Sequence, residues 1–311
     1  MLNSLKGGKI KHKCLLGGAK IMIKLIASDM DGTLLGQKLS ISDENVAAIR
    51  YAEEHGVKFM IATGRNFDEA TPALKEAGLV CPLIAVNGAQ AFDENGKTLF
   101  TIDIQQEEAR QVVKILKEQD LYFEVATTKG IFSDNRPQRL ENMATFIANS
   151  MPHLTYKMAV AMAIAQLDIQ DVHYVEDFEE LFAHEDVKIL KFIAFSPLEA
   201  AALTPARQKI DLIDDLVVTS SFPNNLEVNH RFAQKGIAVQ RMAQAYDIPM
   251  EKVMTIGDNF NDISMLEVAG VSFAMGNAEL AVKEVAKYET DLNTQSGVGK
   301  AIRRAVDERL S

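Results

Sequence analysis

The sequence predicts an α/β fold, in which a doubly wound and mainly parallel sheet forms a core and an α+β cap domain is inserted into it. From Ile23 onward, short apolar runs alternate with amphipathic segments, which is the pattern of parallel strands covered by helices. Between about residues 105 and 224 this pattern gives way to apolar runs punctuated by prolines, and it resumes after Lys235. We therefore expect core segments at 22–104 and 225–311 and the inserted domain at 105–224.

The first core segment contains clear start and stop signals. Ser42 can begin a helix because its hydroxyl can accept a hydrogen bond from a backbone N–H of the first turn. Gly56 and Gly78 each follow an amphipathic run, as glycine commonly does at a helix C-terminus. The expected elements are strands at 24–28, 57–62 and 82–86 and helices at 42–55 and 67–77.

The rest of the chain shows two different patterns of expected helices and strands. In the inserted segment we expect a helix at 107–119 and a second sheet formed by apolar runs at 122–127, 131–133, 187–195 and 217–220. A run at 226–228, just beyond the expected boundary, completes this sheet. In the second core segment, strands alternate with helices again. Its expected elements are helices at 237–246, 262–269, 279–287 and 298–310 and strands at 252–256 and 271–275.

The composition is that of an ordinary globular protein, with 47% hydrophobic and 24% charged residues among 311. The net charge of -10 argues against a nucleic-acid partner, because no basic surface would meet the phosphate backbone. The apolar run at 158–167 is far shorter than the roughly 20 residues of a membrane span, so we expect no membrane segment and interpret this run as a buried element. Two cysteines, Cys14 and Cys81, cannot form a disulfide framework, and we expect a monomer or homodimer in the reducing cytoplasm.

Residues 1–21 differ from the rest of the chain. They contain five lysines and no acidic residue, and they lack the uninterrupted apolar segment of roughly 7–15 residues that a secretory signal requires. We expect a flexible leader here, with folded structure beginning near Met22.

Polar residues gather where the expected core strands end, and this edge is where open α/β sheets bind ligands. They are Asp29 and Asp31, Thr63 and Gly64, Lys235, and Asp258, Asn261 and Asp262. Taken singly, each has a plainer interpretation as a turn, a strand-to-helix loop, a solvated lysine or a helix cap. Their conjunction, in this order, indicates one task, which is the handling of a phosphoryl group.

Phosphoryl transfer depends on positioning and on neutralising the charge of the phosphoryl oxygens. The carboxylate of Asp29 could attack phosphorus, and Asp31 could protonate the leaving oxygen and later deprotonate water. Gly32 would let the backbone turn so that both carboxylates face the site. Mg²⁺ suits such a site because it prefers carboxylate and phosphate oxygens and separates two anions that otherwise repel. Asp258 would complete the metal shell, and Lys235 would add a positive charge beside the nucleophile.

These segments resemble the haloacid dehalogenase superfamily of phosphohydrolases, and in particular its Cof-type branch. The matching segments are LIASDMDGTLL at 25–35, IATGR at 61–65, Lys235-Gly236 and IGDNFNDISML at 256–266, and a further match is Asn87-Gly88-Ala89. The resemblance implies a haloacid dehalogenase-like core with a large cap inserted between the second and third motifs. It also implies a phosphoaspartate intermediate on Asp29, with Asp31 as the general acid and base.

The resemblance also implies ligand sets. The implied Mg²⁺ ligands are the carboxylates of Asp29 and Asp258, the backbone carbonyl of Asp31 and, through water, Asp262. The implied phosphate contacts come from the backbone at Met30, from Thr63 and Gly64, from Lys235 and from Asn261. The stretch before Lys235 lacks the glycine that is common in the branch, so Arg231 is a competing candidate for the cation.

The expected activity is hydrolysis of small phosphorylated metabolites, which the resemblance suggests are of the sugar phosphate, flavin mononucleotide or pyridoxal phosphate type. Two alternatives remain open. One is a phosphotransferase or phosphomutase that uses the same intermediate, and the other is a non-catalytic phosphate-sensing module. We expect the cap to set specificity, and its candidate residues are Arg136, Arg139, Tyr156, Lys157 and His173.

Overall fold

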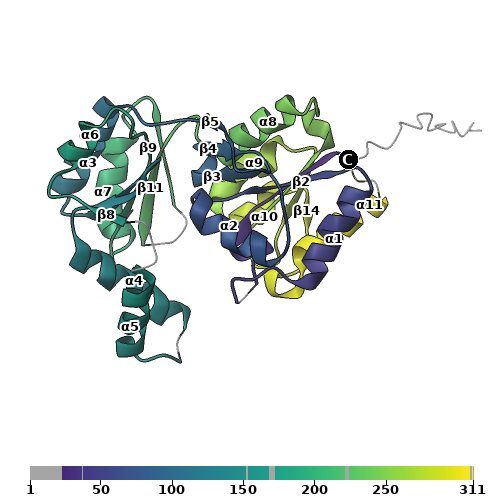
Figure 1. Ribbon diagram of the computed structural model, residues 1–311, viewed down its shortest axis with the longest axis horizontal. Helices are drawn as coiled ribbons and strands as arrows, with labels where there is room; N and C mark the ends of the chain where they lie inside the picture. Colours follow the sequence, from purple (N-terminus) through teal and green to yellow (C-terminus); the bar gives the residue numbers. More distant parts are fainter. Residues whose placement is uncertain are drawn as a thin grey trace, which may run out of the picture.

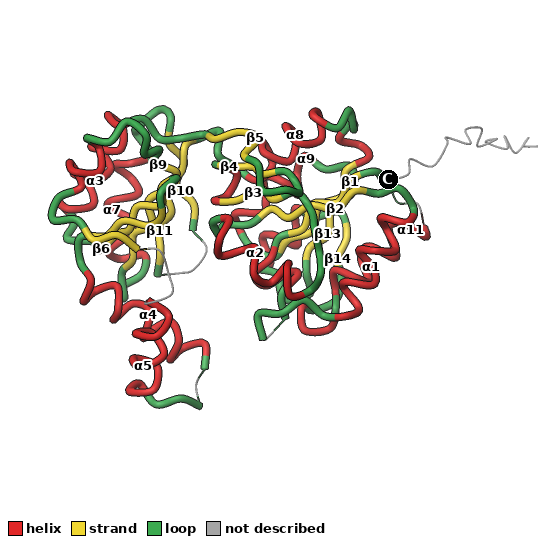
Figure 2. The backbone as a smooth tube through the Cα atoms, viewed as in Figure 1, coloured by secondary structure: helices red, strands yellow, loops and turns green. Residues whose placement is uncertain are grey.

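The structure is a computed structural model that describes residues 23–36, 38–151, 153–167, 172–220, 224–308 and 310. The leader expected at 1–21 lies outside these residues. Two lobes lie side by side (Figure 1), and each is built around its own sheet (Figure 2). The expected α/β fold class is confirmed.

The first lobe, which we call the core, contains an eight-stranded sheet. Its strands are β1 (Leu25–Ser28), β2 (Lys58–Ala62), β3 (Leu83–Ala85), β4 (Gln90–Phe92), β5 (Thr98–Thr101), β12 (Val253–Gly257), β13 (Val271–Ala274) and β14 (Tyr288–Glu289). They lie in the order β14-β13-β12-β1-β2-β3-β4-β5, and the six strands from β14 to β3 are parallel. Because β2 and β3 lie on one side of β1 while β12 and β13 lie on the other, the ends of β1 and β12 mark the switch point at which such sheets bind ligands.

Helices cover both faces of the core sheet (Figure 1). They are α1 (Asp43–Glu54), α2 (Phe67–Glu76) and α11 (Gly297–Glu308) on one face, and α8 (Lys235–Ala245), α9 (Ile263–Val268) and α10 (Leu280–Val285) on the other. Alternation along β1 explains the two layers, because Ile26 packs with Ile49 and Ile302 on one side while Leu25 packs with Met242 on the other.

The second lobe, which we call the cap, contains a six-stranded sheet. Its strands are β6 (Tyr122–Thr127), β7 (Gly130–Ser133), β8 (Val172–Tyr174), β9 (Ile189–Phe195), β10 (Leu216–Thr219) and β11 (Asn225–His230), in the order β10-β11-β9-β6-β7-β8. One face is covered by α3 (Gln106–Glu118), α6 (Phe178–Phe182) and α7 (Ala200–Ile210). The opposite face is turned toward the core.

The cap extends past the expected boundary at residue 224 and includes the run at 226–228, which the sequence places in the second sheet. β11 pairs with both β9 and β10, and its residues Leu226 and Val228 are buried in the apolar cluster of the cap. An end at residue 224 would cut this strand from its sheet, so we place the end of the inserted segment after His230.

A helical hairpin projects from the cap (Figure 1), and it consists of α4 (Arg136–Ser150) and α5 (Tyr156–Leu167). The expectation that 158–167 is a buried element is wrong for most of the run. Ala159 and Ala163, four residues apart on one side of α5, are buried in a small cluster with α4, whereas Met158 and Met162 are exposed. Among the residues that the structure describes, no helix is both long and apolar enough to cross a membrane.

Candidate active site

The ends of two parallel strands bring the first pair of carboxylates together. β1 and β12 are in register with Ser28 beside Ile256, and the backbone N–H of Asp29 donates to the Ile256 carbonyl at 3.0 Å. Asp258 follows β12 directly, so it lies next to Asp29. Gly32 has a φ of +77°, and a Cβ at this position would lie 2.3 Å from Asp258 Oδ2. Only glycine therefore lets the loop after Asp29 turn this closely past Asp258.

Lys235, the first residue of α8, contacts two of the carboxylates at this site. Its ammonium Nζ lies 2.6 Å from Asp29 Oδ1 and 2.6 Å from Asp262 Oδ1, and its side chain is 0% exposed. The helix expected to begin at 237 begins at Lys235 itself. Close packing makes this approach feasible, because a Cβ on Gly236 would lie 2.2 Å from the Ser264 carbonyl oxygen of α9. The competing candidate Arg231 is half exposed and pairs with Asp215 at 3.0 Å instead.

Burial controls the charge of this cluster. It raises the pKa of Asp29 well above the ordinary value, because desolvation together with Asp262 and Asp258 outweighs attraction to Lys235. Burial likewise raises the pKa of Asp258 to about 6, and repulsion by Asp262 adds to the effect. Burial alone would lower the pKa of Lys235, but ion pairs with Asp262 and Asp29 raise it, so the lysine remains charged. One ammonium among three carboxylates leaves the site short of positive charge.

This shortage and the donor chemistry fit a divalent metal. Oxygen atoms of Asp29, Asp258 and Asp262 lie within 4.8 Å of one another, and hard cations prefer such oxygen donors. Asp262 already uses both oxygens, because Oδ1 binds Lys235 and Oδ2 accepts backbone N–H groups of Asp258 and Asn259 at 2.9 and 3.0 Å. Asp262 therefore holds the lysine and the loop, and Asp29 and Asp258 are better placed as direct ligands.

The carboxylate of Asp31 is bound by a residue that the sequence analysis did not single out as a site residue. Arg65 donates from Nε to Asp31 Oδ2 at 2.7 Å and from Nη2 to Oδ1 at 2.5 Å. Such a bidentate pair fixes the orientation of the carboxylate. The Asp31 side chain is half exposed, so it lies at the mouth of the site, whereas Asp29 lies on its buried floor.

The remaining candidates lie around the loops after β2 and β12. Met30 is buried and opens the turn that follows Asp29, and Thr63 is buried at the end of β2. A Cβ on Gly64 would lie 3.0 Å from Asn87 Oδ1, so the Gly64 backbone passes close to this amide. Asn87 Oδ1 accepts from Asn261 Nδ2 at 3.1 Å.

Asn87 also joins the core to the cap. Its Nδ2 donates to Glu227 Oε2 at 2.6 Å, and Glu227 belongs to β11 of the cap sheet. Asn87 was expected only as part of the further family match Asn87-Gly88-Ala89, and no role was expected for Glu227. A usable signal for Glu227 was its place between the apolar residues Leu226 and Val228, since alternation turns such a residue to the other face.

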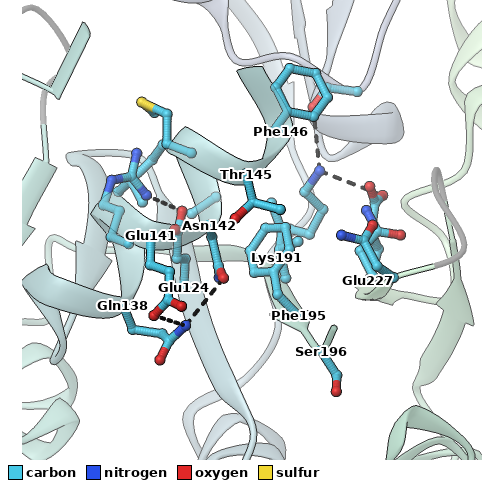
Figure 3. A pocket seen from close by; sticks show the side chains of 18 of the residues that line it. Glu124, Gln138, Glu141, Asn142, Thr145, Phe146, Lys191, Phe195, Ser196 and Glu227 are labelled. Carbon is cyan, nitrogen blue, oxygen red and sulfur yellow. Dashed lines mark hydrogen bonds and ion pairs between the residues drawn. The ribbon is translucent and has the colours of Figure 1, made fainter. Parts of the chain in front are cut away.

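A cavity of about 400 Å³ lies between the cap sheet and the loop that contains Gly64 (Figure 3). Its cap side is formed by alternate residues of neighbouring strands, with Ile193 of β9 in register between Glu124 of β6 and Glu227 of β11. Lys191 lies two residues before Ile193, on the same face of β9. Its Nζ lies 3.5 Å from Glu227 Oε2 and 3.4 Å from the Gly64 carbonyl oxygen. The size and position suit the leaving group of a small substrate.

One of the five expected specificity candidates lines this cavity. Arg139 of α4 is buried there and forms an ion pair with Glu124. Arg136 lies over the ring of Tyr174, and the ring of His173 lies tilted against that of Phe132. The other two candidates, Tyr156 and Lys157, are exposed.

Comparison with known proteins shows similarity over both lobes. The sequence profile of a family described as haloacid dehalogenase-like hydrolase matches residues 26–302. The phosphatase YwpJ of Bacillus subtilis is 32% identical over 278 residues, which cover 89% of this chain and 97% of that protein. The 5-amino-6-(5-phospho-D-ribitylamino)uracil phosphatase YcsE of the same species is 30% identical over 284 residues, which cover 91% of this chain and 96% of that protein. The solved structure of a haloacid dehalogenase-like hydrolase from B. subtilis has a TM-score of 0.81 and 30% identity, covering 90% of this chain and 99% of that one.

Proposed function

The chain belongs to the haloacid dehalogenase-like hydrolase family, and on this premise we propose that it is a Mg²⁺-dependent phosphatase of small metabolites that forms a phosphoaspartate on Asp29. One observation carries the proposal. The Asp29 carboxylate lies 2.6 Å from the fully buried ammonium of Lys235, beside Asp258, at the switch point of the sheet.

In the first step, a carboxylate oxygen of Asp29 attacks phosphorus, the new oxygen–phosphorus bond forms and the bond to the leaving oxygen breaks. Asp31 at the mouth of the site enters this step protonated, with one oxygen released by Arg65 and the other still bound to it, and it gives its proton to the leaving oxygen. In the second step Asp31 takes a proton from water, the resulting hydroxide displaces Asp29 from phosphorus, and inorganic phosphate leaves. Both carboxylates thereby return to their starting states.

Charge is the main obstacle to the first step, because an anionic carboxylate must approach an anionic phosphoryl group. The ammonium of Lys235 favours the charged form of Asp29 against the effect of burial, and it supplies one positive charge. Bound Mg²⁺, held by the carboxylates of Asp29 and Asp258 and the backbone carbonyl of Asp31, would supply further positive charge between the two anions. Thr63, Gly64, Asn261 and the backbone at Met30 would hold the phosphoryl oxygens, and Asp262 would keep Lys235 in place.

The test is phosphate release from a panel of sugar phosphates, flavin mononucleotide and pyridoxal phosphate, with Mg²⁺ and with a chelator. We expect release that requires Mg²⁺, together with hydroxylamine-sensitive phosphate on the protein, as an acyl-phosphate gives. Transfer to an added sugar in preference to water would indicate a phosphotransferase. Substrate binding without any turnover would indicate a sensing module.

A further inference from the structure

The cavity above Gly64 is lined by more acidic than basic side chains. Its ionisable lining residues are the carboxylates Glu69, Glu124, Glu141 and Glu227 and the basic side chains Arg139 and Lys191. Each basic side chain already binds a carboxylate, Arg139 that of Glu124 and Lys191 that of Glu227. All four paired side chains are buried, so neither cation can turn to a ligand without leaving a buried carboxylate unpaired.

The acidic surplus therefore lies on Glu69 and Glu141. Glu69 accepts from the backbone N–H of Asn66 at 3.2 Å, and the nearby guanidinium of Arg65 is bound to Asp31. Glu141 accepts only a long contact of 3.4 Å from the neutral amide of Gln138. Within the described part of the chain, no basic side chain forms an ion pair with either glutamate.

The rest of the wall is neutral (Figure 3). Asn142 Nδ2 is buried and has no hydrogen-bond partner in the described structure, while its Oδ1 accepts from Gln138 Nε2 at 3.3 Å. A buried amide donor of this kind requires an acceptor oxygen, which a ligand can supply. Ile193 and Phe195 add an apolar surface to the same cavity.

We propose that this cavity selects phosphomonoesters whose leaving group is uncharged or cationic and carries hydroxyl or carbonyl oxygens, and that it rejects leaving groups with a second phosphate or a carboxylate. The inference rests on the proposed function, because it assigns the cavity to the leaving group of that reaction. A second anion would meet the half-buried Glu69 and, at the rim, the exposed Glu141, with both cations already paired. Repulsion by the half-buried Glu69 is less screened than in open water, so selection works by excluding the wrong charge.

Three compounds of one size test the proposal, namely glucose 6-phosphate, glucosamine 6-phosphate and 6-phosphogluconate. Turnover is measured with the wild type, and dissociation constants are measured by calorimetry with Mg²⁺ and the Asp29→Asn protein, so that binding is tested independently of catalysis. We expect the carboxylate compound to be at least about 10-fold poorer than the neutral one in both assays, as one unfavourable contact of about 1.4 kcal/mol gives.

Two variants test whether the charge of Glu141 causes this preference. Glu141→Lys, on the exposed side of α4, should reduce this preference several-fold, mainly through tighter binding of 6-phosphogluconate. Glu107→Lys, the same charge change on the far face of the cap, should leave it unchanged. Equal binding of the three compounds by the Asp29→Asn protein, or a preference that Glu141→Lys leaves intact, overturns the selectivity. Selective binding without wild-type turnover overturns the proposed function while supporting the selectivity.

Discussion

The floor of the site and the wall of the cavity above it both bury ion pairs, but their charge balance differs. On the floor, one ammonium, that of Lys235, serves Asp29, Asp258 and Asp262. On the cap wall, each cation has one carboxylate, with Arg139 bound to Glu124 and Lys191 bound to Glu227. The floor is therefore unbalanced, and the pairs of the wall are balanced.

This difference indicates which buried charges can bind a cation, a proton or a ligand. In the unbalanced cluster, burial and repulsion raise the pKa values of Asp29 and Asp258, and the free energy of the site falls if a cation or proton binds. In a balanced pair, both charges are already satisfied, so the pair shapes a surface but gains little from a ligand. Each prediction below tests this contrast.

The largest effect is expected for Asp29→Asn. An amide cannot attack phosphorus, so phosphate release should fall by about 10⁴-fold or more, as removal of a nucleophile does in other enzymes. Lys235 keeps Asp262 as its partner, so the circular dichroism spectrum and cooperative unfolding should be retained. Asp215→Asn, the same change at an exposed ion pair, is the control and should keep full activity. Substantial turnover by Asp29→Asn would remove this residue as the nucleophile.

The next largest effect separates the two candidate cations. Lys235→Gln leaves Asp29 and Asp262 buried without their ammonium, which should lower the free energy of unfolding by about 3–5 kcal/mol and nearly abolish turnover. Arg231→Gln breaks only an exposed pair and should cost about 0–1 kcal/mol with turnover unchanged. Urea unfolding measures the free energy of unfolding of each variant, and phosphate release measures its turnover. The reverse order would show that Arg231 supplies the catalytic charge.

The same contrast explains what the sequence could reveal. On the floor, each candidate lies within a few residues of the end of an expected strand or the start of an expected helix. Parallel register of β1 and β12 brings Asp29 and Asp258 together, and Lys235 joins them from the first turn of α8. Local spacing and a family resemblance were therefore sufficient to propose the cluster. The roles of its members remain proposals. The bidentate contact of Arg65 with Asp31 depends on side-chain direction, which spacing does not give.

The cap wall was less predictable, because its members lie far apart in the chain. Glu124, Lys191 and Glu227 are single polar residues within apolar runs, and only the antiparallel register of β6, β9 and β11 places them on one face. The expected end of the inserted segment at 224 also differs from the structure. The run at 226–228 was expected in the second sheet, but a local pattern does not show that this strand continues to His230 in the sheet of the cap.

A moderate and pH-dependent effect is expected for Asp258→Asn. Burial raises the pKa of Asp258 from its ordinary value of 3.8 to about 6, so the folded metal-free protein binds the proton more tightly than the unfolded chain. The stabilising effect of this proton is present below about pH 4 and is lost as pH rises through about 6. At pH 7.5 with a chelator, the variant should therefore be more stable than the wild type, by about 1–2 kcal/mol after allowance for solvent screening.

Thermal unfolding of Asp258→Asn and wild type from pH 4.5 to 7.5 measures this difference, which should shrink as pH falls. Excess Mg²⁺ should stabilise the wild type more than the variant, because the variant lacks one carboxylate ligand. A difference that does not change with pH would mean that Asp258 is not short of positive charge in the folded protein.

The smallest effect is expected when both members of a balanced ion pair are removed together. Glu124→Leu alone leaves the buried guanidinium of Arg139 without its carboxylate and should cost about 3 kcal/mol. Combined with Arg139→Leu, the cost should fall to about 1 kcal/mol or less, because both charges are then removed and Tyr122 still has Ser133 as a partner for its hydroxyl. Phosphate release from a small neutral substrate should stay within about 3-fold of wild type in the double variant. A double variant that folds but loses turnover would place this pair among the groups that take part in catalysis. The distinction between the balanced ion pairs of the wall and the unbalanced floor would then no longer separate structure from chemistry.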